Sequence, residues 1–491
     1  MIIQIIFVII KVISKIRIKG RYSMSDNIKE ECGIFGIYDK SNIGNIANQV
    51  YFGLFALQHR GQEAAGIAVN RDREITLVKN LGLVSEVFND NNLAHLQGEI
   101  AIGHVRYSTT GNNTPENAQP ISVKYAKGNL TVSHNGNITN AKELREKLES
   151  RGAIFHTTSD SEVVSYLIAN QRLKSKSIEE AVEKVFPMLQ GAFSLLIMSP
   201  RKLIAVRDRF GIRPLCMGKL KDNVIFASES CAFETIGADF ERDVLPGEIV
   251  IVNENETISN KKYCTNRSGL CIFEHIYTAR PDSVIDGQSV NEARMNAGKM
   301  LAKKAPVDAD VVIGVPDSGL PAAIGYANAS GIPYGVGLIK NRYIGRTFIQ
   351  PTQAMRERSV ALKLNTLKSN VEGKRIVMVD DSIVRGTTLA NIIKLLKKSG
   401  AKEVHVRISS PPFIYPCFFG TDIPSRKDLA CNNYTMEELR IKIGADSLVF
   451  MDTATIDQIA PDSTVKFCKG CFTGKYPCRV PGEHDDKNIL E

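Results

Sequence analysis

A buried strand that ends in two aspartates constrains this chain more than any other stretch. Residues 375–379 are largely apolar, the pattern of a strand inside a parallel sheet. Asp380 and Asp381 follow where that strand should end, which is the edge at which open α/β sheets bind their ligands. The sequence therefore predicts an α/β domain with a parallel sheet and a ligand site beside these two carboxylates.

A short glycine-containing loop continues the same stretch. It consists of Arg385, Gly386, Thr387 and Thr388. An apolar helical stripe follows the loop and closes at Gly400. Such a loop presents backbone amides and two hydroxyls at a helix N-terminus, which suits an anion. Phosphate on the loop, with carboxylates beside it that can hold hydroxyl groups or Mg²⁺, fits a phosphorylated sugar.

This stretch resembles the motif with which type I phosphoribosyltransferases bind phosphoribosyl pyrophosphate (PRPP). A second strand–loop–helix unit, residues 308–331, is expected to bring another phosphate loop to the same sheet edge. In that family this loop faces pyrophosphate, and Ser318 aligns with the metal-contacting position. The resemblance thus implies Mg²⁺ at Ser318, Asp380 and Asp381. A simple turn residue is the alternative for Ser318.

A basic run lies between the two loops. It begins at Lys340, contains Gly345 and Arg346, and resembles the family's mobile loop, which closes over PRPP. The resemblance implies that Lys340 and Arg346 bind PRPP. Residues 277–282 also match the family and are expected near the path between the domains.

Composition and charge narrow the class of protein. A length of 491 residues suggests about three domains, and 43% hydrophobic with 23% charged residues excludes disordered and fibrous chains. The net charge of +9 includes no polybasic run, which favours phosphate-rich small molecules over nucleic acid or a membrane. Ten cysteines without a dense framework indicate a reducing compartment, which we take to be the cytoplasm.

The first 31 residues are interpreted as a leader or propeptide. Residues 1–10 are strongly apolar but too short to span a bilayer, and the positive residues follow them, the reverse of a secretory signal. A membrane-surface anchor stays open as an alternative. Met24 opens a more ordinary polar start, so we interpret residues 1–23 as an over-extended start or a dispensable leader.

Cys32 opens a run, residues 32–37, that is predicted to be a strand. A cysteine inside a strand is usually a small buried hydrophobe. Four downstream motifs favour a reactive one, and they occupy residues 57–63, 103–109, 133–137 and 159–162. Together they resemble the glutamine amidotransferase domain of the N-terminal-nucleophile class, over roughly residues 32–265. The resemblance implies a four-layer αββα fold in an α+β N-terminal half.

The chemistry of glutamine hydrolysis suits these residue types. A free cysteine pKa near 8.5 leaves little thiolate at neutral pH. Cleavage between Glu31 and Cys32 would free an α-amino group that titrates near 8 and can take the thiol proton. No catalytic histidine is then needed, so His59, His104 and His134 are interpreted as structural hydrogen-bonding groups.

The resemblance assigns further roles around Cys32. Arg106 is implied to hold the α-carboxylate of glutamine, which its planar fork suits, and Asp160 the α-ammonium group. The Asn135 side chain and the Gly136 N–H are implied to form the oxyanion hole.

Two cysteines in the C-terminal tail, Cys468 and Cys471, form a Cys-x-x-Cys pair that is compatible with zinc, redox or iron–sulfur chemistry. Cys271 and Cys417 are isolated in sequence. They match the other two ligands in the branch of glutamine PRPP amidotransferases that carries a [4Fe–4S] cluster. Four thiolates also suit zinc. We expect a structural cluster, and we interpret the remaining cysteines after Cys32 as ordinary: Cys216, Cys231, Cys264, Cys431 and Cys478.

Taken end to end, residues 24–480 resemble the iron–sulfur, propeptide-bearing amidophosphoribosyltransferases. Four parts are expected: a leader (1–31), a glutamine amidotransferase domain (32–265), a phosphoribosyltransferase domain (266–460) and a tail (461–491). The implied enzyme is a glycosyltransferase with glutaminase activity that makes 5-phosphoribosylamine for purine synthesis, passing ammonia between two sites. The family implies a homotetramer inhibited by purine nucleotides.

Two alternatives stay open at this point. Another N-terminal-nucleophile glutamine amidotransferase would share Cys32 and Arg106 but lack the loop at residues 380–388. A non-catalytic PRPP-binding regulator would share that loop without needing the cysteine-led half, and the sequence contains no helix-turn-helix segment.

Overall fold

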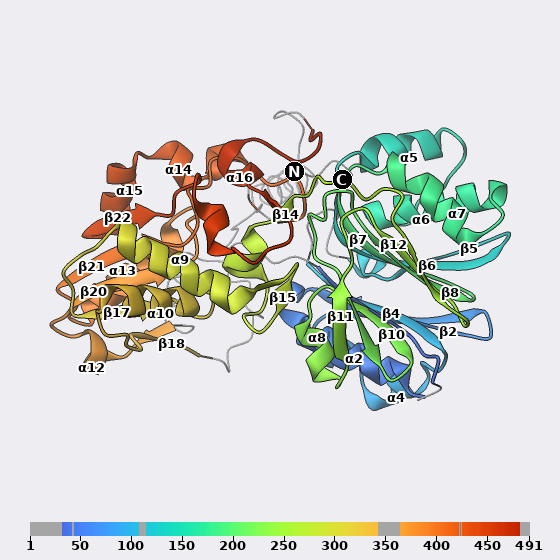
Figure 1. Ribbon diagram of the computed structural model, residues 1–491, viewed down its shortest axis with the longest axis horizontal. Coiled ribbons are helices and arrows are strands. Elements are labelled where there is room, and N and C mark those ends of the chain that lie inside the picture. The colour runs from blue at the N-terminus through green and yellow to red at the C-terminus, as the bar shows by residue number, and fades with distance from the viewer. Residues whose placement is uncertain are drawn as a thin grey trace, which may run out of the picture.

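The computed structural model describes residues 32–41, 44–107, 114–341, 364–421, 423 and 425–481. The predicted leader and Arg346 lie outside these residues. The described chain forms two domains side by side (Figure 1). Within the described residues, no helix is both long enough and apolar enough to cross a membrane.

The N-terminal domain contains two antiparallel sheets. The seven-stranded sheet has, in spatial order, β11 (Asp239–Asp243), β9 (Cys216–Leu220), β10 (Asn223–Ala227), β1 (Gly33–Tyr38), β4 (Ile100–Arg106), β2 (Ala64–Arg71) and β3 (Glu74–Leu81). The six-stranded sheet has β13 (Thr257–Asn260), β12 (Ile249–Val252), β8 (Lys202–Arg207), β7 (Gly191–Ser199), β6 (Gly128–Ile138) and β5 (Ile121–Tyr125).

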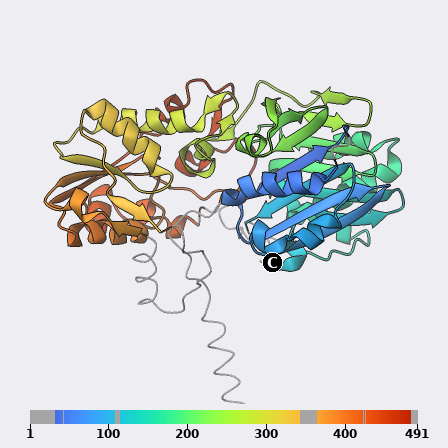
Figure 2. The same ribbon diagram turned by 90° about the horizontal axis from the view of Figure 1, so that it is seen from below.

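Helices cover the outer face of each sheet, so the predicted αββα layering is confirmed (Figures 1 and 2). The seven-stranded sheet carries α2 (Ile46–Ala56), α3 (Val84–Val87), α4 (Asp90–Ala94) and α8 (Cys231–Thr235). The six-stranded sheet carries α5 (Ala141–Glu149), α6 (Asp160–Lys174) and α7 (Ile178–Val185). Short helical turns are η1 (Gln58–Arg60), η2 (Pro115–Asn117) and η3 (Phe186–Met188).

Strand β1, which begins directly after Cys32, is buried on both faces because it lies between a helix layer and the second sheet. Phe35 and Ile37 pack under the helices, whereas Ile34 faces the apolar layer between the two sheets. Helix α7 shows how the outer layer is encoded. The Ser177 side chain caps it by accepting from the Glu180 N–H, and its apolar residues recur with the helical period.

The second domain contains the predicted parallel sheet. Its strands are, in order, β17 (Val311–Gly314), β20 (Arg375–Asp380), β21 (Glu403–Ile408) and β22 (Ser447–Phe450). The helices are α9 (Val290–Lys304), α10 (Gly319–Ser330), α12 (Lys368–Val371), α13 (Thr387–Lys398), α14 (Ala430–Asn433) and α15 (Met436–Ile443). Two small pairs are β15 (Val284–Ile285) with β16 (Gln288–Ser289), and β18 (Leu338–Lys340) with β19 (Leu364–Thr366).

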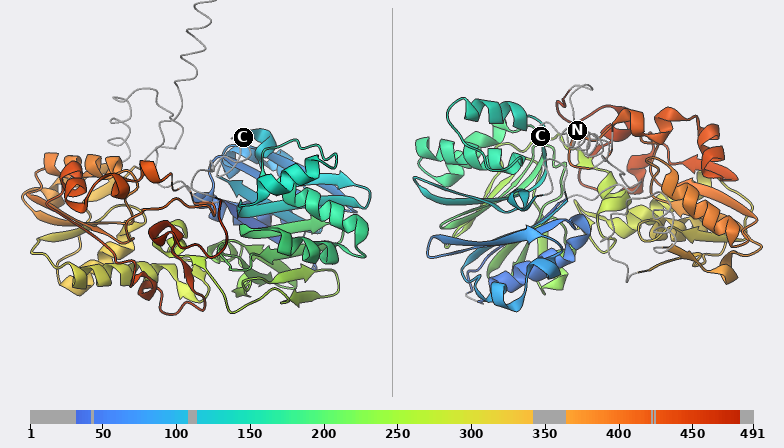
Figure 3. Two further views of the ribbon diagram at one scale, coloured as in Figure 1. Left: turned by 90° about the horizontal axis from the view of Figure 1, so that it is seen from above. Right: turned by 180° about the vertical axis from the view of Figure 1, so that it is seen from behind.

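The C-terminal tail folds back onto the start of the second domain, near the boundary between the domains (Figure 3). Strand β23 (Phe467–Cys468) pairs in parallel with β14 (Leu270–Cys271), and α16 (Gly470–Thr473) follows. Short turns complete the domain: the π-helix η4 (Glu274–Thr278), η5 (Arg426–Asp428) and η6 (Ile456–Ile459).

A buried ion pair joins the two domains. Arg207, in β8 of the first domain, donates to both carboxylate oxygens of Asp286, in the turn between β15 and β16, over 2.8 and 2.7 Å. The guanidinium is fully buried, and its other donors reach the carbonyls of Gly211, Arg213 and Val244. All of its hydrogen-bonding capacity is therefore used inside the protein.

Replacing Asp286 by Ala should destabilise the protein by about 3–5 kcal/mol, because a buried guanidinium loses the carboxylate to which it is directly hydrogen-bonded. Urea unfolding followed by circular dichroism measures the loss. Asp282→Ala is the matched control: Asp282 pairs with Arg280 at the surface, and exposed pairs contribute at most about 1 kcal/mol. Equal effects of the two changes would contradict the interpretation.

Candidate functional site

The structure places Cys32 at one end of the seven-stranded sheet. It directly precedes β1, whose Gly33 lies opposite Val105 of β4. This register brings Cys32 and Arg106, the next residue on each strand, to the same end of the sheet. The thiol lies 3.5 Å from the carbonyl oxygen of Tyr107. The predicted pairing of the cysteine with this arginine is thus a consequence of strand register.

The surroundings of the thiol do not ionise it. Burial raises the pKa of Cys32 to about 11, and the nearby guanidinium of Arg106 offsets only part of that effect. A thiol with this pKa is almost entirely protonated at neutral pH. Nucleophilic attack by Cys32 therefore requires a base that takes its proton.

An ionised carboxylate lies close to the same thiol. Asp160, the first residue of α6, accepts a hydrogen bond from the Ile138 N–H over 3.0 Å, and its other oxygen is 3.4 Å from Nδ1 of His134. Although burial favours the neutral acid, the His134 ring and these hydrogen bonds hold the pKa of Asp160 below its usual value. A carboxylate and the guanidinium of Arg106 thus flank Cys32, an arrangement suited to the two charged ends of an amino acid.

The two residues predicted for the oxyanion hole lie in β6 of the other sheet. Asn135 is fully buried and lies opposite Ser194 in β7. Gly136 has a φ of +137°, and a Cβ atom there would lie 2.1 Å from the carbonyl oxygen of Ala192. Only glycine fits this position. The predicted nucleophile and the residues predicted for the oxyanion hole therefore come from different sheets.

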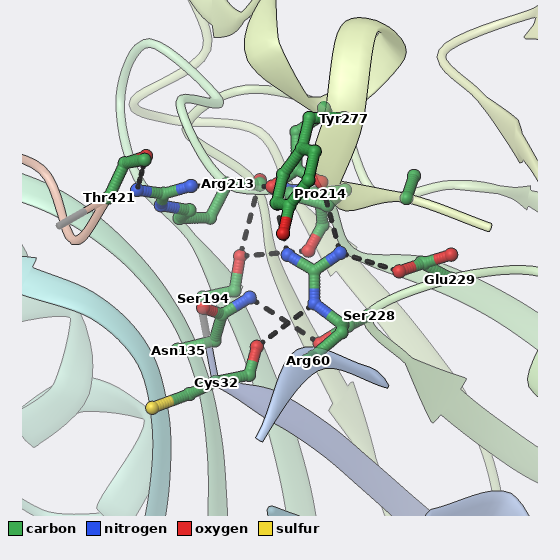
Figure 4. Close-up of polar contacts among 12 residues, drawn as sticks. Cys32, Arg60, Asn135, Ser194, Arg213, Pro214, Ser228, Glu229, Tyr277 and Thr421 are labelled. Carbon is green, nitrogen blue, oxygen red and sulfur yellow. Dashed lines mark hydrogen bonds and ion pairs between the residues drawn. The ribbon is translucent and has the colours of Figure 1, made fainter. Parts of the chain in front are cut away.

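The sequence motif at residues 57–63 contains a functional group whose role was not predicted. Nε of Arg60 donates to the carbonyl oxygen of Cys32 over 3.0 Å, and its terminal nitrogens pair with Glu229 at 2.6 Å and Glu274 at 2.8 Å (Figure 4). All three charged side chains are fully buried. Its partners are 169 and 214 residues away in sequence, so no local pattern could have identified them.

The three histidines predicted to be structural do make hydrogen bonds within the fold. His59 Nε2 lies 2.7 Å from Glu229, and His104 Nε2 lies 2.9 Å from the carbonyl oxygen of His134. His134 itself contacts Asp160 as described above. The contacts agree with that interpretation of all three.

In the second domain the two predicted phosphate loops meet at one sheet edge. Strands β17 and β20 are neighbours, with Gly314 opposite Val379. The Ser318 hydroxyl, in the first loop, donates to Asp381, at the end of β20, over 2.5 Å. Ser318 lies in the turn before α10 as its N-cap residue, and its side chain makes no capping hydrogen bond there.

The paired aspartates repel one another. Withdrawal from water raises the pKa of Asp380, and the neighbouring Asp381 carboxylate raises it further. The pKa of Asp381 is raised as well, again by burial, although hydroxyl donors from Ser318 and Ser382 oppose the shift. Two crowded carboxylates and a hydroxyl are oxygen ligands of the kind that Mg²⁺ takes, together with phosphate oxygens of a substrate. The residues present therefore fit that ion.

The second loop has the predicted geometry for an anion. Gly386 adopts a left-handed conformation with a φ of +84°, and α13 begins at the next residue, Thr387. The backbone amides of this loop therefore lie at the N-terminus of α13, where they can bind an anion. Lys340 reaches the first loop and pairs with Asp317 at 2.6 Å.

The four cysteines predicted to hold a cluster gather in one apolar region beside the tail. Cys271 and Cys468 lie opposite each other in the β14–β23 pair, and the Cys471 carbonyl accepts from the N–H groups of Ile414 and Tyr415, close to Cys417. All four belong to or pack against the same hydrophobic cluster, and none forms a disulfide. The structure thus brings together residues that are up to 200 positions apart in sequence.

The donor set fits an iron–sulfur cluster. Burial raises the pKa of Cys468 to about 12. It also raises the pKa of Cys471, and the thiols of Cys271, Cys417 and Cys468 add to that second shift. Because burial disfavours the charged thiolates, four of them can be held here only if a bound cation offsets their negative charge. In the described part of the chain, no group of three or more His, Cys, Asp or Glu side chains is arranged around one ion. A [4Fe–4S] cluster, whose irons are each bound by one thiolate, would use a donor set of this kind, and zinc could use it as well.

Replacing Asp380 by Asn should stabilise the ligand-free protein at neutral pH. An acid whose pKa is raised on folding destabilises the folded state above its ordinary pKa of 3.8, and the amide oxygen of Asn can still accept from the Asp381 N–H. The gain should be present at about pH 7 and shrink as the pH falls toward 3.8. Urea-unfolding midpoints across this range measure it.

The control for that change is Asp317→Asn, at an exposed aspartate of the neighbouring loop, which should shift the midpoint little. A lower midpoint for Asp380→Asn at neutral pH would show that the aspartate pair does not carry the repulsion described here.

Comparisons with known proteins agree with this geometry. A glutamine amidotransferase domain family matches residues 104–235, and a phosphoribosyl transferase domain family matches residues 287–409. The amidophosphoribosyltransferase of Methanocaldococcus jannaschii is 48% identical over 464 residues, covering 91% of this chain and 98% of that protein. The amidophosphoribosyltransferase of Bacillus subtilis is 47% identical over 459 residues, covering 92% of this chain and 95% of that protein.

Solved structures give the same result over both domains. The glutamine PRPP amidotransferase of B. subtilis, complexed with ADP and GMP, has a TM-score of 0.86 at 45% identity and covers 94% of this chain and 100% of its own. A structure described as the allosteric regulatory enzyme of purine biosynthesis has a TM-score of 0.87 at 45% identity. Similarity across the whole length excludes a glutaminase of another family and a stand-alone PRPP-binding regulator. The chain belongs to the amidophosphoribosyltransferase family.

Proposed function

We propose that this chain transfers the amide nitrogen of glutamine to C1 of PRPP. PRPP, glutamine and water give 5-phosphoribosylamine, pyrophosphate and glutamate, the first committed step of purine synthesis. The observation that carries the proposal is the pairing of two sites in one chain. One is a cysteine flanked by an arginine and an aspartate, and the other is a pair of phosphate loops beside two carboxylates. Ammonia passes from the first site to the second.

At the glutaminase site, Arg106 holds the α-carboxylate of glutamine and Asp160 its α-ammonium group. Removal of residues 1–31 frees the α-amino group of Cys32, which takes the thiol proton. The thiolate adds to the amide carbon, and the oxyanion receives hydrogen bonds from Asn135 and the Gly136 N–H. The protonated amine returns its proton to the departing nitrogen, which leaves as ammonia. Water then hydrolyses the thioester to glutamate.

At the transferase site, the first loop, residues 316–319, binds the pyrophosphate of PRPP. The second loop, Arg385, Gly386, Thr387 and Thr388, binds the 5-phosphate through its amides and hydroxyls. The carboxylates of Asp380 and Asp381 lie between the loops, where they can hold the ribose hydroxyls. Lys340, and Arg346 from outside the described residues, supply positive charge toward the pyrophosphate. Mg²⁺, which Ser318 and the two aspartates would hold, offsets charge on that leaving group.

The [4Fe–4S] cluster would be held by Cys271, Cys417, Cys468 and Cys471 in a structural role, since it would tie the tail to the transferase domain. The B. subtilis relative was solved with ADP and GMP, and we extend nucleotide binding to this chain as purine feedback inhibition. The resemblance supports a homotetramer. Ten cysteines without a disulfide support the cytoplasm as its compartment.

Cys32→Ala should abolish glutamine-dependent synthesis while leaving ammonia-dependent synthesis from PRPP intact, because only the first site needs the thiol. Asp381→Asn should impair the second site instead: the KM for PRPP should rise or the kcat of synthesis should fall, while glutamine hydrolysis assayed alone should be kept. Steady-state kinetics with each nitrogen donor separate the two. Cys216→Ala, at a buried cysteine of the same domain, is the control and should keep both activities. Loss of both activities in folded Cys32→Ala would refute the two-site assignment.

The active protein should also begin at Cys32, because the mechanism uses its α-amino group as the base. Intact mass and N-terminal sequencing of the purified enzyme test this. Active protein that starts at Met1 or Met24 would rule out the amine as base.

The cluster makes a separate prediction. Anaerobically purified protein should be brown and contain roughly four irons per chain. Cys471→Ser should lose the iron and yield insoluble or unprocessed chain. Cys431→Ser, at a cysteine outside the predicted cluster set, should keep its iron and stay soluble and processed. Elemental analysis decides the metal: about one zinc per chain would support the rival ion, and neither metal would refute both.

A further inference from the structure

Ser228 links the nucleophile strand to the oxyanion strand. It directly follows β10, and its N–H donates to the Ile34 carbonyl while the Ile34 N–H donates to its Oγ, both over 3.0 Å. The same Oγ lies 3.5 Å from the side-chain nitrogen Nδ2 of Asn135, which is placed as the donor (Figure 4). Ser228 is 1% exposed. One buried hydroxyl thus lies between the strand that begins after Cys32 and the residue assigned to the oxyanion hole.

Hydrogen-bond accounting determines which way the Asn135 amide must face. Because Ser228 Oγ already accepts from the Ile34 N–H, its own proton remains to be donated. Asn135 Oδ1 is a buried acceptor without a partner among the described residues. The oxygen and nitrogen of an amide are distinguished by their hydrogen bonds, and exchanging them pairs the Ser228 hydroxyl with Oδ1. The buried acceptor is then satisfied, and the amide nitrogen faces away from Ser228 with both protons available.

The neighbouring hydroxyl does not compete for this role. Ser194 lies opposite Asn135 in β7, but its hydroxyl is 3.3 Å from the carbonyl oxygens of Arg213 and Pro214, both acceptors (Figure 4). The described residues therefore leave Ser228 as the hydroxyl that orients the Asn135 amide.

We propose that Ser228 is a positioning residue for glutamine hydrolysis: its hydroxyl accepts from the Ile34 N–H and donates to Asn135 Oδ1, so that the Asn135 N–H faces the developing oxyanion. The inference rests on the proposed function of Asn135. It explains how donors from one sheet stay aligned with a nucleophile from the other, since a single hydroxyl bridges both strands. Loss of the bridge should affect the oxyanion far more than the binding of glutamine.

The test uses Ser228→Ala in the full-length enzyme. Glutaminase kcat should fall about tenfold to a hundredfold, no more than the loss expected on removing one oxyanion donor. The KM for glutamine should stay within about twofold of the wild-type value. Ammonia-dependent synthesis from PRPP should not change. The aldehyde analogue of glutamine, to which the thiol of Cys32 adds to form a hemithioacetal carrying the same oxygen, should bind more weakly by the factor lost in kcat.

A double-variant cycle separates positioning from a general structural effect. Asn135→Ala should lower kcat, and adding Ser228→Ala to it should cause no further loss, because Ser228 acts through Asn135. Ser228→Thr retains the hydroxyl and should restore most of the activity. Ser199→Ala, at a buried serine whose hydroxyl donates to the Lys202 carbonyl across a turn, should resemble the wild type.

Each outcome is decisive. If the losses in kcat multiply in the double variant, the role of Ser228 is overturned and that of Asn135 is kept. The same holds if Ser228→Ala has wild-type kcat while Asn135→Ala is impaired. Unchanged kcat in Asn135→Ala would overturn the oxyanion assignment and this inference with it. If Ser228→Ala does not fold, Ser228→Cys fills the same space with a weaker donor, and wild-type kcat in that variant would overturn the proposal.

Discussion

The buried guanidinium of Arg60 is the group on which the rest of the structure depends. A charge fully withdrawn from water costs several kcal/mol unless it is paired and hydrogen-bonded on every side. Here Glu229 and Glu274 supply the counter-charge, and the Cys32 carbonyl accepts a hydrogen bond from Nε. Glu274 belongs to η4 at the start of the second domain. The Arg60 guanidinium therefore contacts both the backbone of Cys32 in the first domain and a carboxylate of the second domain.

A second arginine extends this network to the region of the cluster cysteines. Arg213 contacts Glu274 at 3.3 Å and donates to the carbonyl oxygen of Phe419, which lies two residues after Cys417. The neighbouring Asn137 side chain in β6 donates to the Phe418 carbonyl over 2.8 Å. The segment that follows Cys417 thus rests against the oxyanion strand. In the proposed reaction, ammonia would be released close to this contact between the domains.

The two sites use burial for different purposes. Around Cys32 it keeps the thiol protonated until a base is available, while hydrogen bonds keep Asp160 ionised in the same pocket. At the end of β20, burial and the closeness of the two carboxylates raise the pKa values of Asp380 and Asp381. A cation bound there, as proposed above, would offset the repulsion between them.

The sequence alone determined every feature that depends on neighbouring residues. The apolar run before Asp380, the glycine-containing loop at residues 385–388 and the helical period after it are local, and they predicted the parallel sheet and a phosphate loop beside it. The motif order after Cys32 likewise indicated the layered glutaminase fold. Tertiary structure decided what depends on distant contacts: the pairing of Arg60 with Glu229 and Glu274, and the contact of Ser228 with Asn135. These partners lie 93 to 214 residues apart. Such pairs leave no periodic trace in a single sequence, because only the packing of sheets and domains brings them together.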